Sequence, residues 1–261
     1  MKVVVLGAGG MGGYAARTAS TLGFIDELIV ADLDATAASA TAAACGAAAR
    51  GTTVDVCDPS DLARLLAPAD AVLNTVGPFF RLGPPVLRAA IETGTHYLDI
   101  NDDWESTEAM LAMDADARAA GITAVIGMGA SPGMSNLMAV LAMRELDEVE
   151  EVLAGFDLDA AMPETRGAKP AAATVHGLHQ LTGTIRVFEN GAFRDARPMQ
   201  TVHIDYPGLG QRTGWTMGHP EAITFPRSRP GLHASRVVMT MSAGNRLAVR
   251  LQRRAYPGRQ A

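Results

Sequence analysis

The first 32 residues constrain the fold most, because an apolar run, a glycine turn and a second apolar run follow one another directly. Residues 3–6 are all apolar and predict a strand buried on both faces. A G-x-G-x-x-G turn over residues 7–12 follows, then a helical stretch, then a second apolar strand at residues 28–31. That strand leads to Asp32, 20 residues beyond the last glycine of the turn. Strand, turn, helix, strand and acid in this order predict a dinucleotide-binding βαβ unit.

Each glycine of the turn has its own physical task. Gly7 permits the tight turn, Gly9 lets the backbone approach a pyrophosphate, and Gly12 lets the helix pack against the strand. The free helix amides face the phosphates, and Asp32 accepts hydrogen bonds from the adenosine ribose hydroxyls. An α/β turn that binds nothing is the alternative. The predicted cofactor site comprises Gly7, Ala8, Gly9, Gly10, Met11, Gly12 and Asp32.

The residues around Asp32 also favour one cofactor. Leu33 follows the acid, and no adjacent arginine is present to pair with a 2′-phosphate. Because a carboxylate that accepts from a 2′-hydroxyl repels a phosphate in the same place, we expect NAD(H) to be favoured. NADP(H) stays possible, with Arg50 as a distant partner for the phosphate.

Strands and helices alternate through the first half of the chain, and strands dominate the second. The first half predicts a doubly wound parallel Rossmann sheet, with strands at residues 3–6, 28–31, 52–57, 69–76, 96–100 and 122–128. We therefore expect an α/β fold with a dinucleotide-binding domain at residues 1–130 and a smaller α+β domain at residues 131–261. The second domain is predicted to hold a mainly antiparallel sheet, with strands at residues 150–158, 184–189, 192–197, 201–206, 221–225 and 235–241. Asn190-Gly191 predicts a type I′ hairpin between two of these strands.

Four motifs together resemble the saccharopine dehydrogenase (reductase-like) family. They are the opening turn and the segments 70–79, 94–99 and 129–136. The resemblance covers residues 1–145 well and continues more loosely to about residue 235. It implies an NAD(P)-dependent oxidoreductase that transfers hydride at a carbon–nitrogen bond, as in an imine formed from an amine and an oxo acid. Relatives continue well beyond the equivalent of Met241, where this chain has a polar, basic segment that predicts no long helix.

Small and polar residues follow the fourth and fifth predicted strands. Ligands of a doubly wound sheet lie outside the carboxyl ends of its strands. The nicotinamide ribose is therefore expected against four residues after the fourth strand, Asn74, Thr75, Gly77 and Pro78, and the resemblance supports this placement. An ordinary strand-to-helix turn is the alternative. Tyr97 and Asp99 share one face of the fifth strand and are the candidate catalytic residues; a buried Tyr97 or a helix-capping Asp99 is equally compatible with the pattern.

Candidate substrate contacts come from both predicted domains. Ser131 and Gly133 read as the N-cap and first turn of a helix running to about residue 146, whose amides would hold a substrate carboxylate or simply be capped. His176 and His179 lie on one face of a later helix, and Arg166 precedes it. Polar helix faces and solvated loop charges are the simpler explanation for these three. No metal site is expected.

Composition narrows the function classes. A net charge of −6 argues against a nucleic-acid partner, no segment approaches the length of a membrane span, and the two cysteines match no metal or redox spacing. We expect a cytoplasmic enzyme acting on a small molecule, and a homodimer formed through sheet edges of the second domain. The alternatives are reduction of a C=C or C=O bond in a lipid-like substrate, or a nucleotide-binding protein without catalysis.

Overall fold

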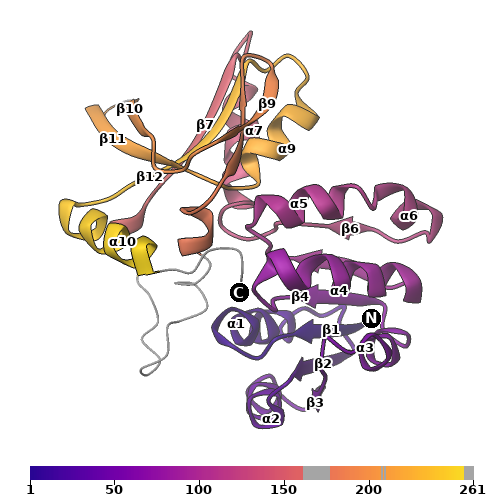
Figure 1. The fold of residues 1–261 in the computed structure, drawn as a ribbon. Coiled ribbons are helices and arrows are strands. Elements are labelled where there is room, and N and C mark those ends of the chain that lie inside the picture. The colour runs from indigo at the N-terminus through magenta and orange to yellow at the C-terminus, as the bar shows by residue number, and fades with distance from the viewer. Residues whose placement is uncertain (161–176, 207, 209, 256–261) are drawn as a thin grey trace. The chain divides into compact units, whose positions relative to one another are not determined.

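The chain divides into two compact units, residues 1–133 and 134–261 (Figure 1). The structure is a computed structural model, and it describes residues 1–160, 177–206, 208 and 210–255. The division falls between Gly133 and Met134, three residues later than the boundary expected from the sequence. None of the helices in the described residues is long and apolar enough to cross a membrane.

The first unit is a six-stranded sheet in the order β3-β2-β1-β4-β5-β6, with every neighbouring pair parallel. Its strands are β1 Lys2–Leu6, β2 Glu27–Asp32, β3 Ala49–Thr53, β4 Ala71–Asn74, β5 His96–Asp99 and β6 Ala124–Val125. Its helices are α1 Gly10–Ala19, α2 Ala35–Ala44, α3 Pro59–Leu66, α4 Phe79–Thr93, α5 Trp104–Leu111 and α6 Asp114–Ala119. The predicted doubly wound sheet is confirmed.

Two apolar clusters explain why this sheet is covered on both faces. Val3 and Val5 of β1 pack with alanines of α1 and α2 on one face. Val4 and Leu6 point to the opposite face and pack with residues of α3 and α4. An uninterrupted apolar strand is what such two-sided burial requires, because successive side chains alternate between the faces. Asp58 accepts hydrogen bonds from the first amides of α3, as the Asp-Pro start of that segment predicted.

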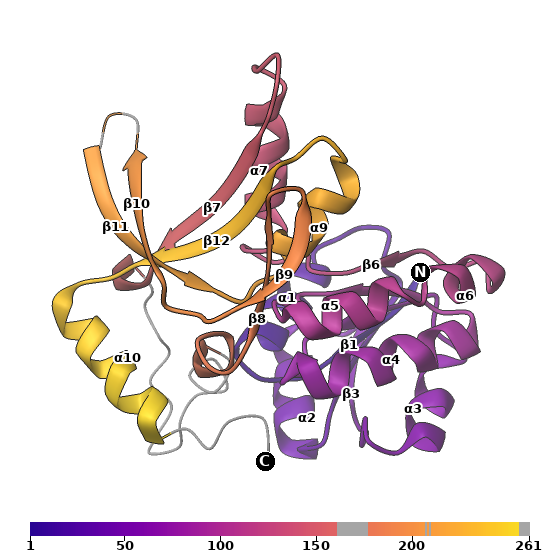
Figure 2. The same ribbon diagram turned by 45° about the horizontal axis from the view of Figure 1, so that its top comes forward.

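The second unit is built on a mixed, mainly antiparallel sheet (Figure 2). The strand order is β10-β11-β12-β8-β9, and β7 runs parallel to β12 on the other side of that strand. The strands are β7 Glu151–Asp157, β8 Ile185–Glu189, β9 Ala192–Ala196, β10 Thr201–Tyr206, β11 Gly210–Met217 and β12 Ala234–Thr240. The helices are α7 Met134–Met143, η1 Leu158–Ala160, α9 Glu221–Ser228 and α10 Ala243–Ala255, and a further helical segment spans 177–180.

The second unit has two apolar clusters. Met143 of α7 and Phe225 of α9 belong to the first. Val249 of α10 packs with Val237 and Met239 of β12 in the second. The predicted hairpin is confirmed, because Asn190 and Gly191 between β8 and β9 both have positive φ, 54° and 74°.

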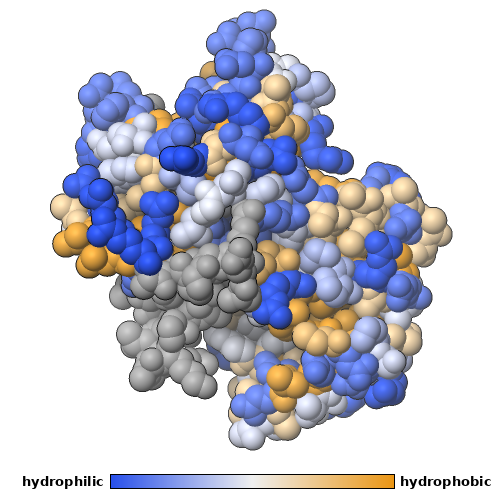
Figure 3. Space-filling model, viewed as in Figure 1, coloured by the Kyte–Doolittle hydropathy of each residue, from blue (hydrophilic) through white to orange (hydrophobic). Residues whose placement is uncertain are grey.

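Two sequence predictions for the second unit are wrong, and one of its strands was not predicted. Residues 221–225 form the start of α9 rather than a strand. A run this short does not distinguish the periodicity of a helix from that of a strand, and Pro220 can begin a helix. The polar segment after Met241 forms α10, whose Leu247 and Leu251 are exposed. Figure 3 shows hydrophobic and hydrophilic residues side by side in the region of this helix. Strand β11 was missed, because its polar, glycine-bearing sequence lacks apolar alternation.

Candidate functional site

The three glycines of the G-x-G-x-x-G pattern differ in the space around them, which is open at Gly9 and filled at Gly7 and Gly12. Gly7 has a φ of +95°, and its amide donates to the Ala31 carbonyl at 2.8 Å. A side-chain carbon at Gly12 would overlap the Gly7 carbonyl oxygen, whereas one at Gly9 would have no neighbour within 4 Å. Helix α1 begins at Gly10 without a side-chain cap on its N-terminus. The turn therefore presents backbone amides and an unfilled space together, as a bound phosphate group requires.

Asp32 ends β2 and is tied to the glycine turn. Its Oδ2 accepts a hydrogen bond from the Ala8 amide at 2.6 Å, and its Oδ1 accepts one from the Asp34 amide at 2.9 Å. The carboxylate thus shapes the turn, and Asp32 remains only partly buried. Arg50 lies elsewhere, because it pairs in register with Ile29 and its guanidinium contacts Glu27 at 3.0 Å.

The turn after β4 packs directly on the glycine turn. The Thr75 amide and hydroxyl both donate to the Leu6 carbonyl, at 2.9 and 2.6 Å. The same hydroxyl lies 2.6 Å from where a side-chain carbon of Gly7 or Gly12 would stand. Asn74, which is fully buried, accepts a hydrogen bond from the Val76 amide at 3.0 Å. Gly77 and Pro78 then lead into α4. The structure therefore brings Asn74 and Thr75 beside the predicted phosphate turn.

Tyr97 and Asp99 lie beneath the surface at the end of β5, with exposed fractions of 2% and 0%. The Tyr97 hydroxyl donates to Asp99 Oδ2 at 2.7 Å and accepts from the Asn74 side-chain amide at 3.2 Å. Asp99 Oδ1 accepts from the amides of Asn101 and Gly127, at 3.0 and 2.7 Å. Tyr97 is thus buried, as one alternative from the sequence held, and Asp99 joins the end of β5 to the loop after β6. Their catalytic role stays a prediction.

Burial sets the electrostatics of this pair. Desolvation raises the pKa of Tyr97 well above its usual value, and the neighbouring Asp99 charge raises it further. Desolvation also raises the pKa of Asp99, against the opposing effect of the hydrogen bonds from Gly127 and Tyr97. At neutral pH the hydroxyl therefore keeps its proton, and it serves as the donor in the hydrogen bond to Asp99.

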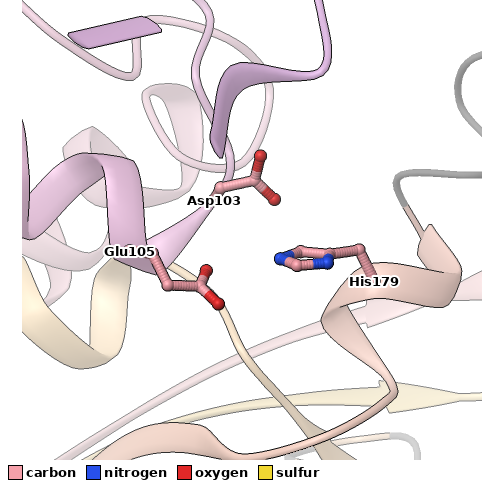
Figure 4. Close-up of side chains that lie close together, drawn as sticks. All are labelled: Asp103, Glu105 and His179. Carbon is pink, nitrogen blue, oxygen red and sulfur yellow. The ribbon is translucent and has the colours of Figure 1, made fainter. Parts of the chain in front are cut away.

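A second polar group at the end of β5 was not predicted from the sequence. Asp103 is fully buried just before α5, and its Oδ2 accepts from the Phe80 amide at the start of α4, at 2.9 Å. Its carbonyl accepts from Ser106 and Thr107 in the first turn of α5. Figure 4 shows the Asp103 and Glu105 carboxylates at this end of α5. The sequence signal that could have located Asp103 is the polar run directly after the buried strand β5.

The loop before α7 differs from its prediction. Ser131 and Gly133 were expected as the N-cap and first turn of a helix, but α7 begins only at Met134. Gly133 instead has a φ of +116° and forms a bridge with Gly129, and the Gly129 amide donates to the Pro132 carbonyl at 2.9 Å. A glycine held in this conformation cannot start a helix, so the segment closes a tight loop of the first unit instead.

Of the predicted substrate contacts in the second unit, His179 alone lies among the described residues. Arg166 and His176 lie outside the described residues. His179 is 4% exposed on the segment 177–180 and is drawn in Figure 4. Its role as a substrate contact stays a prediction.

The second unit buries its own polar network, which sequence reasoning missed. Glu221, at the start of α9, is fully buried, and its Oε1 accepts from the Ser135 hydroxyl of α7 at 2.7 Å. Its Oε2 is hydrogen-bonded to Nδ1 of His219, which is also buried. Because 86 residues separate Ser135 from Glu221, no local pattern signals their contact.

The second unit also has a pocket of about 550 Å³ where β12 ends between β7 and the β10–β11 hairpin. Phe156, Tyr206 and Trp215 contribute aromatic rings to its lining, and Asp157 and Asp159 contribute carboxylates. The Asp159 carboxylate is already engaged by the Ser242 amide and hydroxyl. Among the described residues, none of those predicted to bind a ligand lines this pocket.

Comparison with known proteins identifies the first unit most clearly. Residues 3–125 match the family described as the saccharopine dehydrogenase NADP binding domain. Carboxyaminopropylagmatine dehydrogenase of Synechocystis is 25% identical over 253 residues, which cover 92% of this chain and 62% of that protein.

Two solved structures share the fold. Saccharopine dehydrogenase (L-Glu forming) of Saccharomyces cerevisiae matches with a TM-score of 0.63 at 20% identity, over 91% of this chain and 54% of that one. The homospermidine synthase of Legionella pneumophila, solved with NAD, matches with a TM-score of 0.61 at 13% identity, over 99% of this chain and 70% of that one. The chain therefore spans 54–62% of the saccharopine and carboxyaminopropylagmatine dehydrogenases that it matches.

Proposed function

We propose that the protein is an NAD(P)-dependent oxidoreductase acting at a carbon–nitrogen bond, because its residues 3–125 match the saccharopine dehydrogenase NADP binding domain and its similar proteins are dehydrogenases. The observation that carries the proposal is the glycine turn, which combines an open space at Gly9 with uncapped amides at the start of α1. A bound nicotinamide dinucleotide would accept or supply the hydride.

The residues of the first unit fit such a cofactor. The turn at residues 7–12 would hold the pyrophosphate, and Asp32 the adenosine ribose. The turn from Asn74 to Pro78 would lie beside the nicotinamide ribose, because it follows β4 at the carboxyl edge of the sheet. Tyr97 and Asp99 are buried at the end of β5 and would position this edge of the sheet, and their direct catalytic role stays a prediction.

The substrate class that we propose is a secondary amine formed from an amino compound and an oxo acid. The names of the similar proteins, which refer to carboxyaminopropylagmatine, saccharopine and homospermidine, support this class. In the reductive direction the amine and the oxo acid take up one proton and lose water to give an iminium ion. Hydride then adds to the iminium carbon and gives the neutral secondary amine. Since the iminium ion already carries positive charge, the protein needs to orient it and exclude water more than to supply a strong acid. We place Ser131, Gly133 and His179 among the groups that contact it.

The reaction is tested by following NADH oxidation with a panel of amines paired with oxo acids. We expect turnover only when both partners are present, together with a secondary amine in the product by mass spectrometry. Turnover of an oxo acid or of an unsaturated lipid without an amine would contradict the proposal. A chain that binds NADH and turns over no substrate would instead favour the nucleotide-binding alternative.

NAD(H) is the cofactor that we propose within this class. The Asp32 carboxylate would repel a 2′-phosphate. Arg50 would not pair with that phosphate, because it contacts Glu27 at the other end of β2 from Asp32. Calorimetric titration should give a lower Kd for NADH than for NADPH. An equal or lower Kd for NADPH would overturn this choice.

We also propose that the protein is a cytoplasmic homodimer joined through its second unit. Among the described residues β7 pairs with β12 alone, and α7 exposes the apolar side chains of Met134, Leu137, Met138 and Leu141. Light scattering should give twice the chain mass at micromolar concentration, and a monomer there would exclude this assembly.

A further inference from the structure

The turn after β4, the end of β5 and the loop after β6 are joined by one buried line of hydrogen bonds. We call it the Tyr97 chain and define it as Asn74, Tyr97 and Asp99. The Asn74 side-chain amide donates to the Tyr97 hydroxyl, which donates to Asp99, and Asp99 accepts from the Gly127 amide. All three side chains are at most 2% exposed.

Both ends of the Tyr97 chain reach segments assigned to ligands. At one end Asn74 holds the Val76 amide, and the adjoining Thr75 touches the glycine turn through Leu6. At the other end Asp99 holds the amide of Gly127, and its carbonyl accepts from the Met128 amide at 2.8 Å. Gly127 opens the loop that contains Ser131 and Gly133. Every link lies within the first unit.

Each group in the chain has a fixed direction. Asn74 Oδ1 is occupied by a backbone amide, so its Nδ2 must face Tyr97. Asp99 Oδ1 is occupied by two backbone amides, so its Oδ2 must accept from the hydroxyl. Burial keeps the Tyr97 proton in place, since the pKa of Tyr97 lies well above its usual value. Neither neighbour can reverse its side chain without abandoning a backbone amide inside the protein.

We propose that the Tyr97 chain is a positioning device that couples the dinucleotide turn to the substrate loop at residues 127–133. This inference rests on the proposed function. A cofactor bound at the glycine turn restricts the motion of Thr75. The hydrogen bonds of the Tyr97 chain then restrict the Gly127 amide, on the far side of β4 and β5. Tyr97 acts through Asn74 and Asp99 and contacts neither ligand.

The test compares Tyr97→Phe with Tyr206→Phe, which removes a hydroxyl in the second unit. NADH affinity is measured by calorimetry, and amide exchange at Gly127 and Met128 by NMR with and without NADH. Tyr97→Phe should weaken NADH binding about five-fold or more, a typical size for coupling between sites. It should also abolish the slowing of exchange that NADH causes at both amides, whereas Tyr206→Phe should resemble the wild type.

A paired exchange distinguishes the chain from general packing. Asn74→Asp alone and Asp99→Asn alone each disturb one junction with the hydroxyl. Together they reverse the chain, because the new carboxylate at position 74 accepts from Tyr97 and the new amide at position 99 donates to it. Both positions still accept their backbone amides, so the double variant should recover most of the affinity that either single variant loses.

Three results would overturn the proposal. Wild-type NADH affinity in Tyr97→Phe refutes the coupling, and so does a double variant that is no better than the worse single variant. If Tyr97→Phe fails to fold, the paired exchange still decides. A wild-type chain that binds no dinucleotide would refute the proposed function together with the coupling. Failure of the coupling alone is recognised by a wild-type chain that does bind NADH.

Discussion

Asp99 in the first unit and Glu221 in the second are both completely buried carboxylates, and they are held in different ways. Asp99 in the first unit is held largely by main-chain amides, those of Asn101 and Gly127, with Tyr97 as its side-chain partner. Glu221 in the second unit is held by the side chains of Ser135 and His219. Main-chain donors stay in place as long as the sheet edge does, whereas side-chain donors depend on α7 and α9 packing in register. The first arrangement lies at the candidate site, and the second joins α7 to the start of α9.

The largest effect is expected from Glu221→Ala. It removes the acceptor for the Ser135 hydroxyl and the His219 ring in a fully buried place. Removing the acceptor of a buried hydrogen bond costs about 1–3 kcal/mol of unfolding free energy for each donor that loses it, and here two donors lose theirs. Urea denaturation measures this loss, with the exposed Glu148→Ala as the control, expected to stay within about 0.5 kcal/mol of the wild type. A Glu221→Ala protein as stable as the control would break the comparison.

Two glycine substitutions test how far the first unit depends on its main chain. Gly12→Ala places a carbon against the Gly7 carbonyl oxygen, which cannot move aside as a side chain would. We expect a loss of roughly 1–3 kcal/mol in unfolding free energy, as for other overpacked sites. Gly9→Ala meets open space and should change stability by no more than about 0.5 kcal/mol. Equal losses in thermal or urea unfolding would contradict the geometry of the turn.

Asp99→Asn sharpens the comparison through its pH dependence. The new amide still accepts the two backbone bonds, so the loss of unfolding free energy should be about 1 kcal/mol. Burial raises the pKa of Asp99 in the folded state above its value in the unfolded state. The protonated carboxyl therefore contributes stability to the folded wild type at low pH, and this contribution is lost as pH rises and Asp99 ionises. The deficit of Asp99→Asn should therefore shrink between about pH 4 and neutrality. A deficit that grows toward neutral pH would mean that the charged carboxylate is favoured.

The smallest effect concerns Tyr97 in alkali. Its folded pKa lies well above the usual value, so its contribution to stability is full below about pH 10 and falls as pH rises further. The tyrosinate absorbance of folded Tyr97→Phe should match that of the wild type up to about pH 10.5. A missing ionisation in the variant below that pH would show that Tyr97 is accessible.

The two units also differ in how far the sequence predicts them. Apolar runs, glycine stops and Asp-Pro caps lie within a few residues of the elements they define, so the sequence predicted all six strands of the first sheet. The third was displaced, because β3 spans Ala49–Thr53 and not the predicted 52–57. The Asn190-Gly191 hairpin succeeded for the same reason. Strand β11 and α9 failed, because tertiary pairing decides segments whose own pattern is short or polar.

The candidate site follows the same division. The glycine turn and Asp32 are local motifs, and the structure brings them together as expected. The burial of Tyr97 was an open alternative, because position along a strand does not reveal depth beneath the sheet edge. Asp103 and Glu221 were missed, because their partners come from other elements.

Calorimetric titration of NADH into the wild type and Gly9→Val tests the central claim most directly. The substituted side chain would occupy the space where the pyrophosphate is expected, while nothing in the protein stands within 4 Å of its first carbon. The account predicts that the wild type binds NADH, and that Gly9→Val keeps the wild-type thermal unfolding midpoint but gives no binding heat. A Gly9→Val protein that binds NADH as tightly as the wild type would contradict it.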